Sequence, residues 1–592
     1  MNNISRDESM TNHSQREIIA RLIKYLKPYK WQSGVVVVLF ILIMLIEVVN
    51  PYLLKIAIDD NIANGDINGL FVIGGILVGI NLVGYVLSRF KFILLAKITN
   101  KTLLDIREEL YQHIQTLSFD FFDSRPVGKI LARVVGDVTS LKNLFDQTIS
   151  TLIPSIMMLI TVAIAMLVLN FKLGLCCIAL LPILGIAMGY IEINADRRWK
   201  IYRNKRSAFN GFTHEDFSGI KVVQAFGNEK LTEEKFEGLV DELSDTFVDA
   251  VRIQDTFWPC VEMSWGVGTL VVFIVGYKLF TGGEIEIGTL VAFCGYIGMF
   301  WRPISNLTTF INSLTTNFSA ADRIFDILDT KAQIVSDKGA ESIGEITGEV
   351  EFEDVDFKYE ENGRKILDNV SFTVKPGERV ALVGPTGAGK TTIISLLSRF
   401  YDPVCGKVLV DGKDIKHVDL KSYRSQMGIM LQDTFLFSTS IKENIRYGRL
   451  DATDEEIIAA AKAVNAHEFI VRLENGYDTE VNERGSRLSL GQRQLISFAR
   501  ALLANPKILI LDEATSNIDT QTEILVQHGI EKLMKDRTSF VIAHRLSTIR
   551  DCDKIMVINH GQIVEAGTHE ELLKKQGEYH KLYTAQYSFI DA

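Results

Sequence analysis

The sequence is poor in cysteine and has no excess of basic residues. Its six cysteines show no C-x-x-C or Cys/His spacing, so neither a metal site nor a disulfide framework is predicted. Acidic residues outnumber basic ones by 73 to 63, which argues against a nucleic-acid partner because such proteins usually present a basic face. A cleavable signal peptide is not expected, since the first 15 residues are polar and the next apolar run is too long.

The sequence is rich in long apolar runs. Hydrophobic residues make up 47% of the sequence while charged residues still reach 23%, a mixture typical of membrane segments joined to a soluble domain. Six runs approach the ~20 residues that a membrane-spanning helix needs. They are Gly34–Leu54, Leu70–Leu87, Ile149–Leu169, Leu173–Ile191, Phe257–Phe280 and Ile287–Ile304. Ahead of them, residues 16–31 predict a basic amphipathic helix that lies in the membrane interface.

The loop charges predict the orientation of these spans. The loop Ala57–Gly69 has no Lys or Arg, whereas the long segments 88–148 and 192–256 hold many. The positive-inside rule therefore places both termini and both long segments in the cytoplasm, with the spans in the cell membrane. We expect the long segments to extend the spans as helices, interrupted by short cross-pieces near Phe119–Lys129 and Asn210–Ser218.

Three acidic residues, Glu47, Glu192 and Glu262, lie in or near the spans. An ionisable group at membrane depth is costly and usually faces protein or water. Two interpretations stay open: these carboxylates receive a cationic substrate, or they hold structural positions near the membrane interface. Large side chains that could line an apolar cavity are Met157, Met158, Phe273, Met299, Phe300 and Trp301.

The composition changes after residue 328 and predicts four parts. They are a tail with the interfacial helix (1–31), a six-helix transmembrane domain (32–328), a polar linker (329–349) and a cytoplasmic α/β domain with a helical subdomain (350–592).

A glycine-rich motif dominates the last part. An apolar strand ends at Val383 and a helical run begins near Ile393, with a G-x-x-x-x-G-K-[ST] phosphate loop between them. Its glycines let backbone N–H groups face phosphate oxygens, and the following helix adds its positive dipole end. Within the loop, Lys390 can reach the β- and γ-phosphates and the Thr391 hydroxyl can ligate Mg²⁺. The loop consists of Gly384, Pro385, Thr386, Gly387, Ala388, Gly389, Lys390, Thr391 and Thr392.

Other motifs complete a nucleotide site. Asp512 ends the buried strand Ile508–Leu511 and is placed to hold Mg²⁺, while Glu513 is placed to orient the attacking water. His544 follows a second apolar run and is placed to contact the γ-phosphate. Tyr359 can stack on adenine, and Gln432 can touch Mg²⁺ or the water.

A second anion site is predicted at Ser489, Leu490, Gly491 and Gln492, where a helix begins. It cannot easily serve the same phosphate loop, so it is expected to serve a nucleotide on another copy of the domain.

Together these motifs resemble the ATP-binding cassette transporters, in particular exporter half-transporters whose membrane domain precedes the cassette. The resemblance covers nearly the whole chain and implies ATP and Mg²⁺ as ligands and a second half-transporter as partner. It assigns the loop as Walker A, Gln432 as Q-loop, Ser489–Gln492 as the signature that acts in trans, Asp512 as Walker B and Glu513 as catalytic glutamate. It also assigns Asp519 to the D-loop and His544 to the H-loop, with Glu513, His544 and Lys390 as the catalytic residues.

The signature departs from the family pattern, because Leu490 replaces the first glycine of L-S-G-G-Q. Its side chain adds bulk and removes conformational freedom beside a phosphate-facing backbone. An altered signature with an intact Glu513 is typical of one subunit of heterodimeric bacterial exporters, so a heterodimer is favoured over a homodimer. The implied function is ATP-driven export of a drug, lipid or peptide; a homodimeric exporter or flippase, or a nucleotide-gated channel or receptor, is the alternative.

Overall fold

The computed structural model describes residues 13–337, 339–360, 363–430, 434–482, 485, 487–512, 520–542 and 546–587. The chain divides into two compact units, one made of the residues up to Gln115 with Gly128–Thr330, the other of Thr116–Val127 with the residues from Lys331 onward. The short segment Thr116–Val127 therefore packs with the C-terminal unit, although the sequence on either side of it belongs to the first unit.

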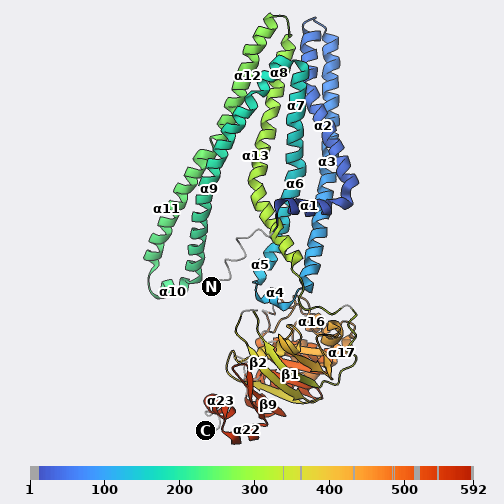
Figure 1. Cartoon of the computed structure of the whole chain (residues 1–592), viewed down its shortest axis with the longest axis vertical. Helices are drawn as coiled ribbons and strands as arrows, with labels where there is room; N and C mark the ends of the chain where they lie inside the picture. Colours follow the sequence, from blue (N-terminus) through green and yellow to red (C-terminus); the bar gives the residue numbers. More distant parts are fainter. Residues whose placement is uncertain are drawn as a thin grey trace. The chain divides into compact units, whose positions relative to one another are not determined.

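The first unit is helical (Figure 1). Its long helices exceed the length needed to cross a bilayer and continue beyond it. The α-helices are α1 (Gln15–Leu26), α2 (Lys30–Ile56), α3 (Ile67–Thr116), α5 (Val127–Ala132), α6 (Val138–Gln147), α7 (Ile153–Leu169), α8 (Phe171–Ile178), α9 (Leu180–Ser218), α10 (Ile220–Ala225), α11 (Glu229–Gln254), α12 (Phe257–Thr281) and α13 (Ile287–Asp329). A 3₁₀ turn (Lys27–Tyr29) and three π-helical turns, η2 (Ala57–Ile62), η3 (Arg133–Asp137) and η4 (Thr148–Leu152), join some of them.

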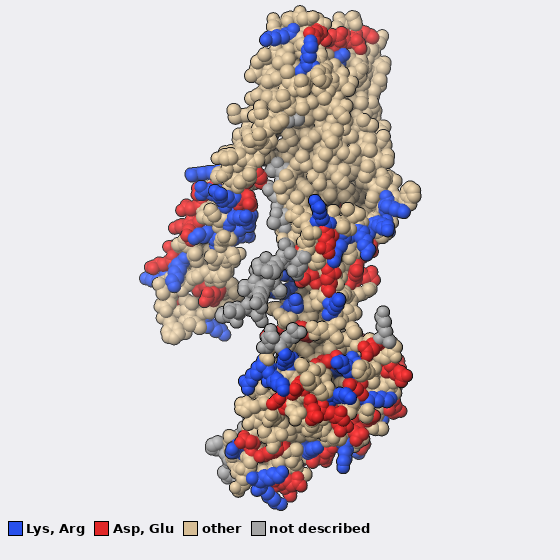
Figure 2. Space-filling model, viewed as in Figure 1, with Lys and Arg blue, Asp and Glu red and all other residues tan. Residues whose placement is uncertain are grey.

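Among the described residues, five helical segments are long and apolar enough to span a membrane: Gln15–Ile62, Ile67–Thr116, Val127–Leu169, Glu229–Thr281 and Ile287–Ile311. Figure 2 shows the matching feature on the first unit, a broad belt with almost no charged residues between charged ends.

The predicted fourth span is not one unbroken helix. The chain leaves α8 at Ile178 and enters α9 at Leu180. Pro182 lies in the first turn of α9, where its missing N–H costs nothing, but it cannot continue a helix that comes from α8. The six predicted spans agree with the structure if α8 and the start of α9 are counted together as one broken span.

The prediction of a cross-piece near Asn210–Ser218 is wrong. Helix α9 continues through these residues because none of them is a proline, and it ends at Gly219, whose N–H donates to the Glu215 carbonyl. The cross-piece is α10, and Gly227, at φ 63°, turns the chain into α11. Helices α9 and α11 lie side by side (Figure 1), and we call α9, α10 and α11 together the hairpin arm.

The cytoplasmic end of α13 is held by α1 and by His13, which lies two residues before that helix. One ring nitrogen of His13 lies 2.8 Å from Asp322 Oδ1, and the other lies 2.9 Å from Asp329 Oδ2. Arg21 donates to Asp329 at 2.9 Å. Burial alone would lower the pKa of His13, but the hydrogen bonds to Asp322 and Asp329 outweigh it and raise that pKa.

A second cluster ties the same end of α13 to η3. Arg323 contacts both carboxylate oxygens of Asp137, at 2.9 and 2.6 Å, and Arg133 contacts the same carboxylate at 3.1 Å. Asp137 is buried between the two guanidinium groups. We call α13 from Asp322 to Asp329, together with α1 and η3, the clasped arm.

The second unit is an α/β domain with two sheets. The antiparallel sheet has the order β2-β1-β4-β5, and the larger one has the order β10-β9-β3-β8-β7-β6, in which only β10 is antiparallel. Its strands are β1 (Val350–Phe357), β2 (Leu367–Val374), β3 (Arg379–Val383), β4 (Cys405–Val410), β5 (Lys413–Asp414), β6 (Met427–Met430), β7 (Ile508–Asp512), β8 (Thr538–Ile542), β9 (Lys554–Asn559) and β10 (Gln562–Gly567). The central strands β3, β7 and β8 are buried along almost their whole length because parallel sheets are covered on both faces.

Helices complete this unit. They are α4 (Phe119–Asp123), α14 (Lys390–Leu397), α15 (Leu420–Arg424), α16 (Ile441–Arg446), α17 (Asp454–Ala463), α18 (His467–Val471), α19 (Leu490–Ala504), α20 (Thr520–Met534), α21 (Leu546–Arg550), α22 (His569–Lys575) and α23 (Glu578–Tyr587). Helices α16, α17 and α19 pack on one another and form the helical part expected from the sequence.

Candidate functional site: a nucleotide site and a membrane cavity

The phosphate loop connects β3 to α14, as the sequence predicts. Gly384 and Gly389 adopt φ values of 149° and 111°, which side chains rarely tolerate. A Cβ at Gly384 would lie 2.1 Å from the Ile558 carbonyl oxygen, and one at Gly389 would lie 2.7 Å from Leu367 Cδ2. These glycines are therefore required both by backbone conformation and by close packing.

Lys390 lies across the loop that precedes it. Its Nζ donates to the Gly384 carbonyl at 2.8 Å and to the Pro385 carbonyl at 3.0 Å. Burial lowers the pKa of Lys390, and the negative charge of Asp512 opposes that shift. The phosphate-loop lysine and the carboxylate at the end of β7 thus act on each other electrostatically.

The remaining described residues suit a nucleotide with Mg²⁺. The residue Thr391 is exposed in the first turn of α14, and Asp512 is half-buried at the carboxyl end of β7. A hydroxyl and a carboxylate are the hard oxygen ligands that Mg²⁺ takes beside phosphates. Tyr359, 44% exposed, is held at its hydroxyl by Thr392 of α14, with 3.1 Å between the two oxygens.

Four predicted site residues, Gln432, Glu513, Asp519 and His544, lie outside the described residues, and their roles stay predictions. The strands that precede three of them are described: β6 ends at Met430, β7 at Asp512 and β8 at Ile542. These strands are parallel to β3, so their carboxyl ends share the sheet edge from which the phosphate loop emerges.

The predicted second anion site is the start of α19. Ser489 is the N-cap: its hydroxyl accepts from the Gln492 N–H at 3.2 Å, and its own N–H donates to Gln492 Oε1 at 3.0 Å. Leu490 is the first helical residue and does not have a positive φ. The expected loss of backbone freedom at Leu490 is therefore without consequence, and only the bulk of its side chain distinguishes it from glycine.

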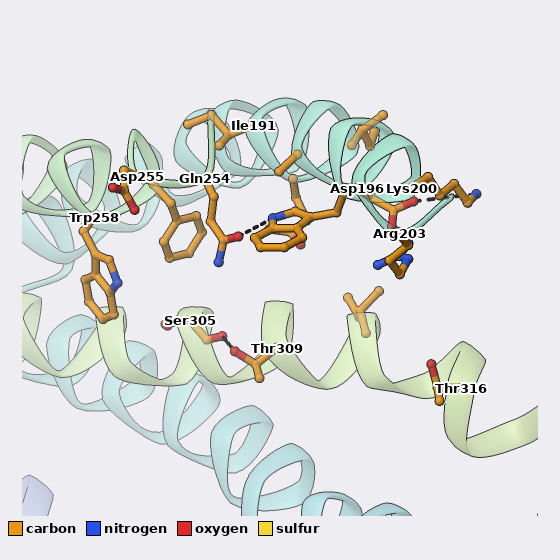
Figure 3. Close-up of a pocket in the computed structure, with 16 residues that line it drawn as sticks. Ile191, Asp196, Lys200, Arg203, Gln254, Asp255, Trp258, Ser305, Thr309 and Thr316 are labelled. Carbon is orange, nitrogen blue, oxygen red and sulfur yellow. Dashed lines mark hydrogen bonds and ion pairs between the residues drawn. The ribbon is translucent and has the colours of Figure 1, made fainter. Parts of the chain in front are cut away.

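A cavity of about 810 Å³ lies in the first unit between α13 and the helices α9, α11 and α12 (Figure 3). Its walls carry the indole of Trp199 and of Trp258, and the hydroxyls of Ser305 and Thr309 from α13. Asp196 faces Arg203 at 3.3 Å, and the Trp199 indole N–H donates to Gln254. The charged residues that line it are Glu192, Asp196, Lys200, Arg203 and Asp255.

A second cavity of about 470 Å³ shares Ile191 with the first and has an apolar wall that includes Leu180, Ile183, Met263 and Val267. Of the three acidic residues noted in the sequence, Glu192 lines the first cavity, while Glu262 on α12 and Glu47 on α2 are exposed.

The large side chains that could line an apolar cavity are not among the residues that line these two cavities, and three of them have the packing role that is usual for such residues. Phe300 is buried in the helical core, and Met158 and Met299 pack against it. Trp199 was missed because it lies in a segment interpreted as a cytoplasmic extension, where its aromatic character alone gave no signal.

A glycine-rich phosphate loop at the edge of a parallel sheet, in a chain that also has membrane-spanning helices, defines a membrane-bound P-loop nucleotide hydrolase. Comparison with known proteins gives the family. Residues 33–304 match the ABC transporter transmembrane region, and residues 367–516 match the ABC transporter ATPase family. The chain belongs to the ABC transporters.

Two relatives from Bacillus subtilis (strain 168) match nearly end to end. The ABC transporter ATP-binding protein YknV, described as uncharacterized, is 42% identical over 96% of this chain and 94% of its own length. The "Putative multidrug export ATP-binding/permease protein YgaD" is 39% identical over 96% of this chain and 99% of its own length. A solved structure of a bacterial Atm1-family ABC exporter with ATP bound superposes with a TM-score of 0.74 at 28% identity, covering 94% of this chain and 98% of that one.

The protein is therefore an ATP-hydrolysing, multi-pass membrane transporter of the exporter type, with its ATPase domain in the cytoplasm. Exporters of this family act as dimers in the lipid bilayer.

Proposed function

We propose that this protein is one half of a dimeric exporter that moves a hydrophobic or amphipathic substrate out of the cytoplasm or inner leaflet by alternating access. Drugs, lipids and peptides are the substrate classes. One observation carries the proposal: a single chain combines a formed phosphate loop with a cavity, among the long helices of the first unit, that has both charged and aromatic walls.

The phosphate loop, Gly384–Thr392, binds the ATP phosphates through its backbone N–H groups, and Lys390 offsets charge on the transferred phosphoryl group. Tyr359 stacks on adenine. Thr391, Asp512 and Gln432 would hold Mg²⁺, which supplies further charge neutralisation when bound. Glu513 orients the attacking water, and His544 contacts the γ-phosphate.

The start of α19 serves the nucleotide of a partner half-transporter. Ser489 and Gly491 present a hydroxyl and a bare N–H at a helix N-terminus, and Asp519 belongs to the same shared interface. A heterodimer is favoured over a homodimer because Leu490 places an isobutyl group where a bare glycine is usual, which makes the signature that this chain lends the weaker one.

The paired cavities favour an amphipathic substrate. A polar or charged group fits the cavity lined by Asp196, Lys200 and Arg203, and an apolar body fits the adjoining cavity beyond Ile191. The relative named for multidrug export supports the same substrate class for this chain.

The hydrolytic role is tested with Glu513→Gln in the full-length complex in nanodiscs. We expect ATP binding to persist while turnover falls by about 100-fold or more, because a positioned general base contributes ~10²–10⁴-fold. Glu531→Gln, an exposed residue on α20 with the same charge change, is the control. Turnover of Glu513→Gln equal to that of the control would contradict the proposal.

The partner is tested by co-expression with the product of the neighbouring reading frame, followed by mass measurement of the purified complex. We expect a one-to-one heterodimer. A complex of two identical chains with full ATPase activity would contradict the heterodimer and leave the exporter function intact.

A further inference from the structure

The short helix α4 packs on the nucleotide-binding unit through two aromatic-rich contacts. The ring of Phe119 lies 4.1 Å from that of Phe400, centroid to centroid. The Tyr401 hydroxyl donates to the carboxylate of Asp123. Burial raises the pKa of the Tyr401 phenol, and the hydrogen bond to Asp123 raises it further, so this phenol stays protonated and remains a donor.

Tyr401 also touches the residue that we assign to adenine. Its ring lies 5.1 Å from that of Tyr359 at an interplanar angle of 89°. Phe357, buried at the end of β1, lies 4.9 Å from the Tyr359 ring at 88°. Perpendicular aromatic pairs at these separations are favourable and orientation-dependent, so Tyr401 and Phe357 together fix the plane of the Tyr359 ring.

The other end of Tyr359 is fixed by the phosphate-loop helix. Its hydroxyl lies 3.1 Å from Thr392 Oγ1, and Thr392 is buried in the first turn of α14. The ring as a whole is still 44% exposed. Tyr359 is thus held at its hydroxyl and along its ring, with exposed surface left for a base to stack on.

We propose that Tyr401 is a positioning residue for the nucleotide base: its ring orients Tyr359, and its hydroxyl bond to Asp123 makes that orientation depend on whether α4 is docked. The inference rests on the proposed role of Tyr359 in stacking on adenine. Docking of α4 then controls how well the site recognises the base, separately from how it holds the phosphates.

Affinity for the base and affinity for the phosphates are separable because they use different residues. The phosphates bind the backbone of Gly384–Thr392, whereas the α4 contacts described above are made to Phe400 and Tyr401. Removing the Asp123–Tyr401 bond should therefore weaken binding of ATP but not of inorganic tripolyphosphate, which has no base.

The test uses the full-length chain in nanodiscs and measures the Kd of ATP and of tripolyphosphate by displacement of a fluorescent ATP analogue. The variants are Tyr401→Phe, Asp123→Ala and Tyr359→Leu, alone and combined. Alanine is used at 123 because asparagine would keep an oxygen that accepts the Tyr401 hydrogen bond. Asp120→Ala is the matched control, since it removes the same charge from α4 and leaves the hydrogen bond to Tyr401 in place.

We expect Tyr401→Phe and Asp123→Ala each to weaken ATP binding about threefold to tenfold, with tripolyphosphate binding unchanged. The double variant should lose no more than either single one, because both remove the same bond. In the Tyr359→Leu background, Asp123→Ala should have no further effect.

Three results would overturn the inference: a parallel loss of tripolyphosphate binding, an undiminished effect of Asp123→Ala in the Tyr359→Leu background, or an equal loss in Asp120→Ala. If Tyr359→Leu alone leaves ATP binding unchanged, the proposed stacking role fails, and the positioning role fails with it. If Tyr359→Leu weakens ATP binding but Tyr401→Phe does not, only the positioning role fails.

Discussion

The clasped arm and the hairpin arm are both built around long helices that continue the membrane spans, and among the described residues they are held by different kinds of contact. The clasped arm is fixed by His13, Arg21 and Arg323 through three carboxylates, those of Asp137, Asp322 and Asp329. The hairpin arm is held together by contacts between its own helices, such as the ion pair between Lys205 and Glu242.

The two short cross-pieces, α4 and α10, differ in how far their side chains are buried. In α4, Phe121 is 3% exposed, whereas none of the residues of α10 is buried. Val222 on α10 and Phe226 directly after it are 61% and 75% exposed. A short helix that presents apolar side chains to water is expected to bind something, and the proposed partner subunit supplies that surface. Helix α4 thus buries an aromatic ring within its own unit, whereas α10 leaves apolar side chains exposed.

The largest expected effect on stability is at α4. Phe121→Ala removes a buried aromatic ring and should cost about 3 kcal/mol of local stability. Hydrogen exchange of residues 116–127 measures this, and faster exchange confined to that segment is the expected result. Exchange unchanged from wild type would show that α4 is no better held than α10, and the contrast between the arms would fail.

The next effect is at the ion cluster of the clasped arm. Asp137→Ala leaves Arg133 and Arg323 facing each other without their shared carboxylate. Because Arg323 is partly exposed, we expect the free energy of unfolding to fall by about 2 kcal/mol, rather than by the 3–5 kcal/mol typical of a fully buried pair. The melting temperature of the protein in detergent, which should fall, measures this loss. Asp196→Ala in the hairpin arm, whose ion pairs are exposed, should shift that temperature far less.

The stability of the clasped arm is expected to depend on pH through His13. Its folded pKa is raised above 6.5 by Asp322 and Asp329, despite burial. Asp329, whose pKa is lowered mainly by Arg21, stays ionised throughout this range. The imidazolium therefore adds stability that is fully present below pH 6.5 and is lost as pH rises through the higher folded pKa.

His13→Gln should accordingly cost about 1 kcal/mol at acidic pH and progressively less at alkaline pH. Melting temperatures of both proteins across this range provide the measurement. A difference that grows with pH would have the opposite sign and would contradict the charged clasp.

The smallest effect on stability is expected at α10. Phe226→Ser should change the melting temperature of the chain very little, since the side chain is already exposed, with a cost below about 0.5 kcal/mol. The ATPase rate of the assembled transporter should nevertheless fall about tenfold, as for an interface anchor. Tyr111→Ser, another exposed aromatic on α3, is the control. Equal rates in both variants would mean that α10 binds no partner.

The sequence allowed the family and fold class to be predicted because their signals are local. A strand, a glycine cradle and a helix follow one another over Val380–Leu397, and Asp512 ends an apolar strand. The roles of Glu513, His544 and Gln432 stay predictions. The helix through Asn210–Ser218 was misjudged because asparagine and glycine were weighed without their position in the helix.

Contacts such as Asp123–Tyr401 and His13–Asp322 join residues far apart in the chain, so local sequence patterns do not predict them. The same holds for the cavity, whose walls come from four helices. Leu490 was expected to constrain the backbone, but whether a position needs glycine depends on its φ, which the sequence alone does not give.

The central claim is that this chain supplies half of a composite ATPase. The most direct measurement is the ATPase rate per chain in nanodiscs that hold one chain, compared with nanodiscs that hold the chain with its partner. The claim predicts that hydrolysis requires the pair, with single-chain discs at least about tenfold slower because the start of α19 must come from another chain. Equal rates per chain in the two preparations would contradict it.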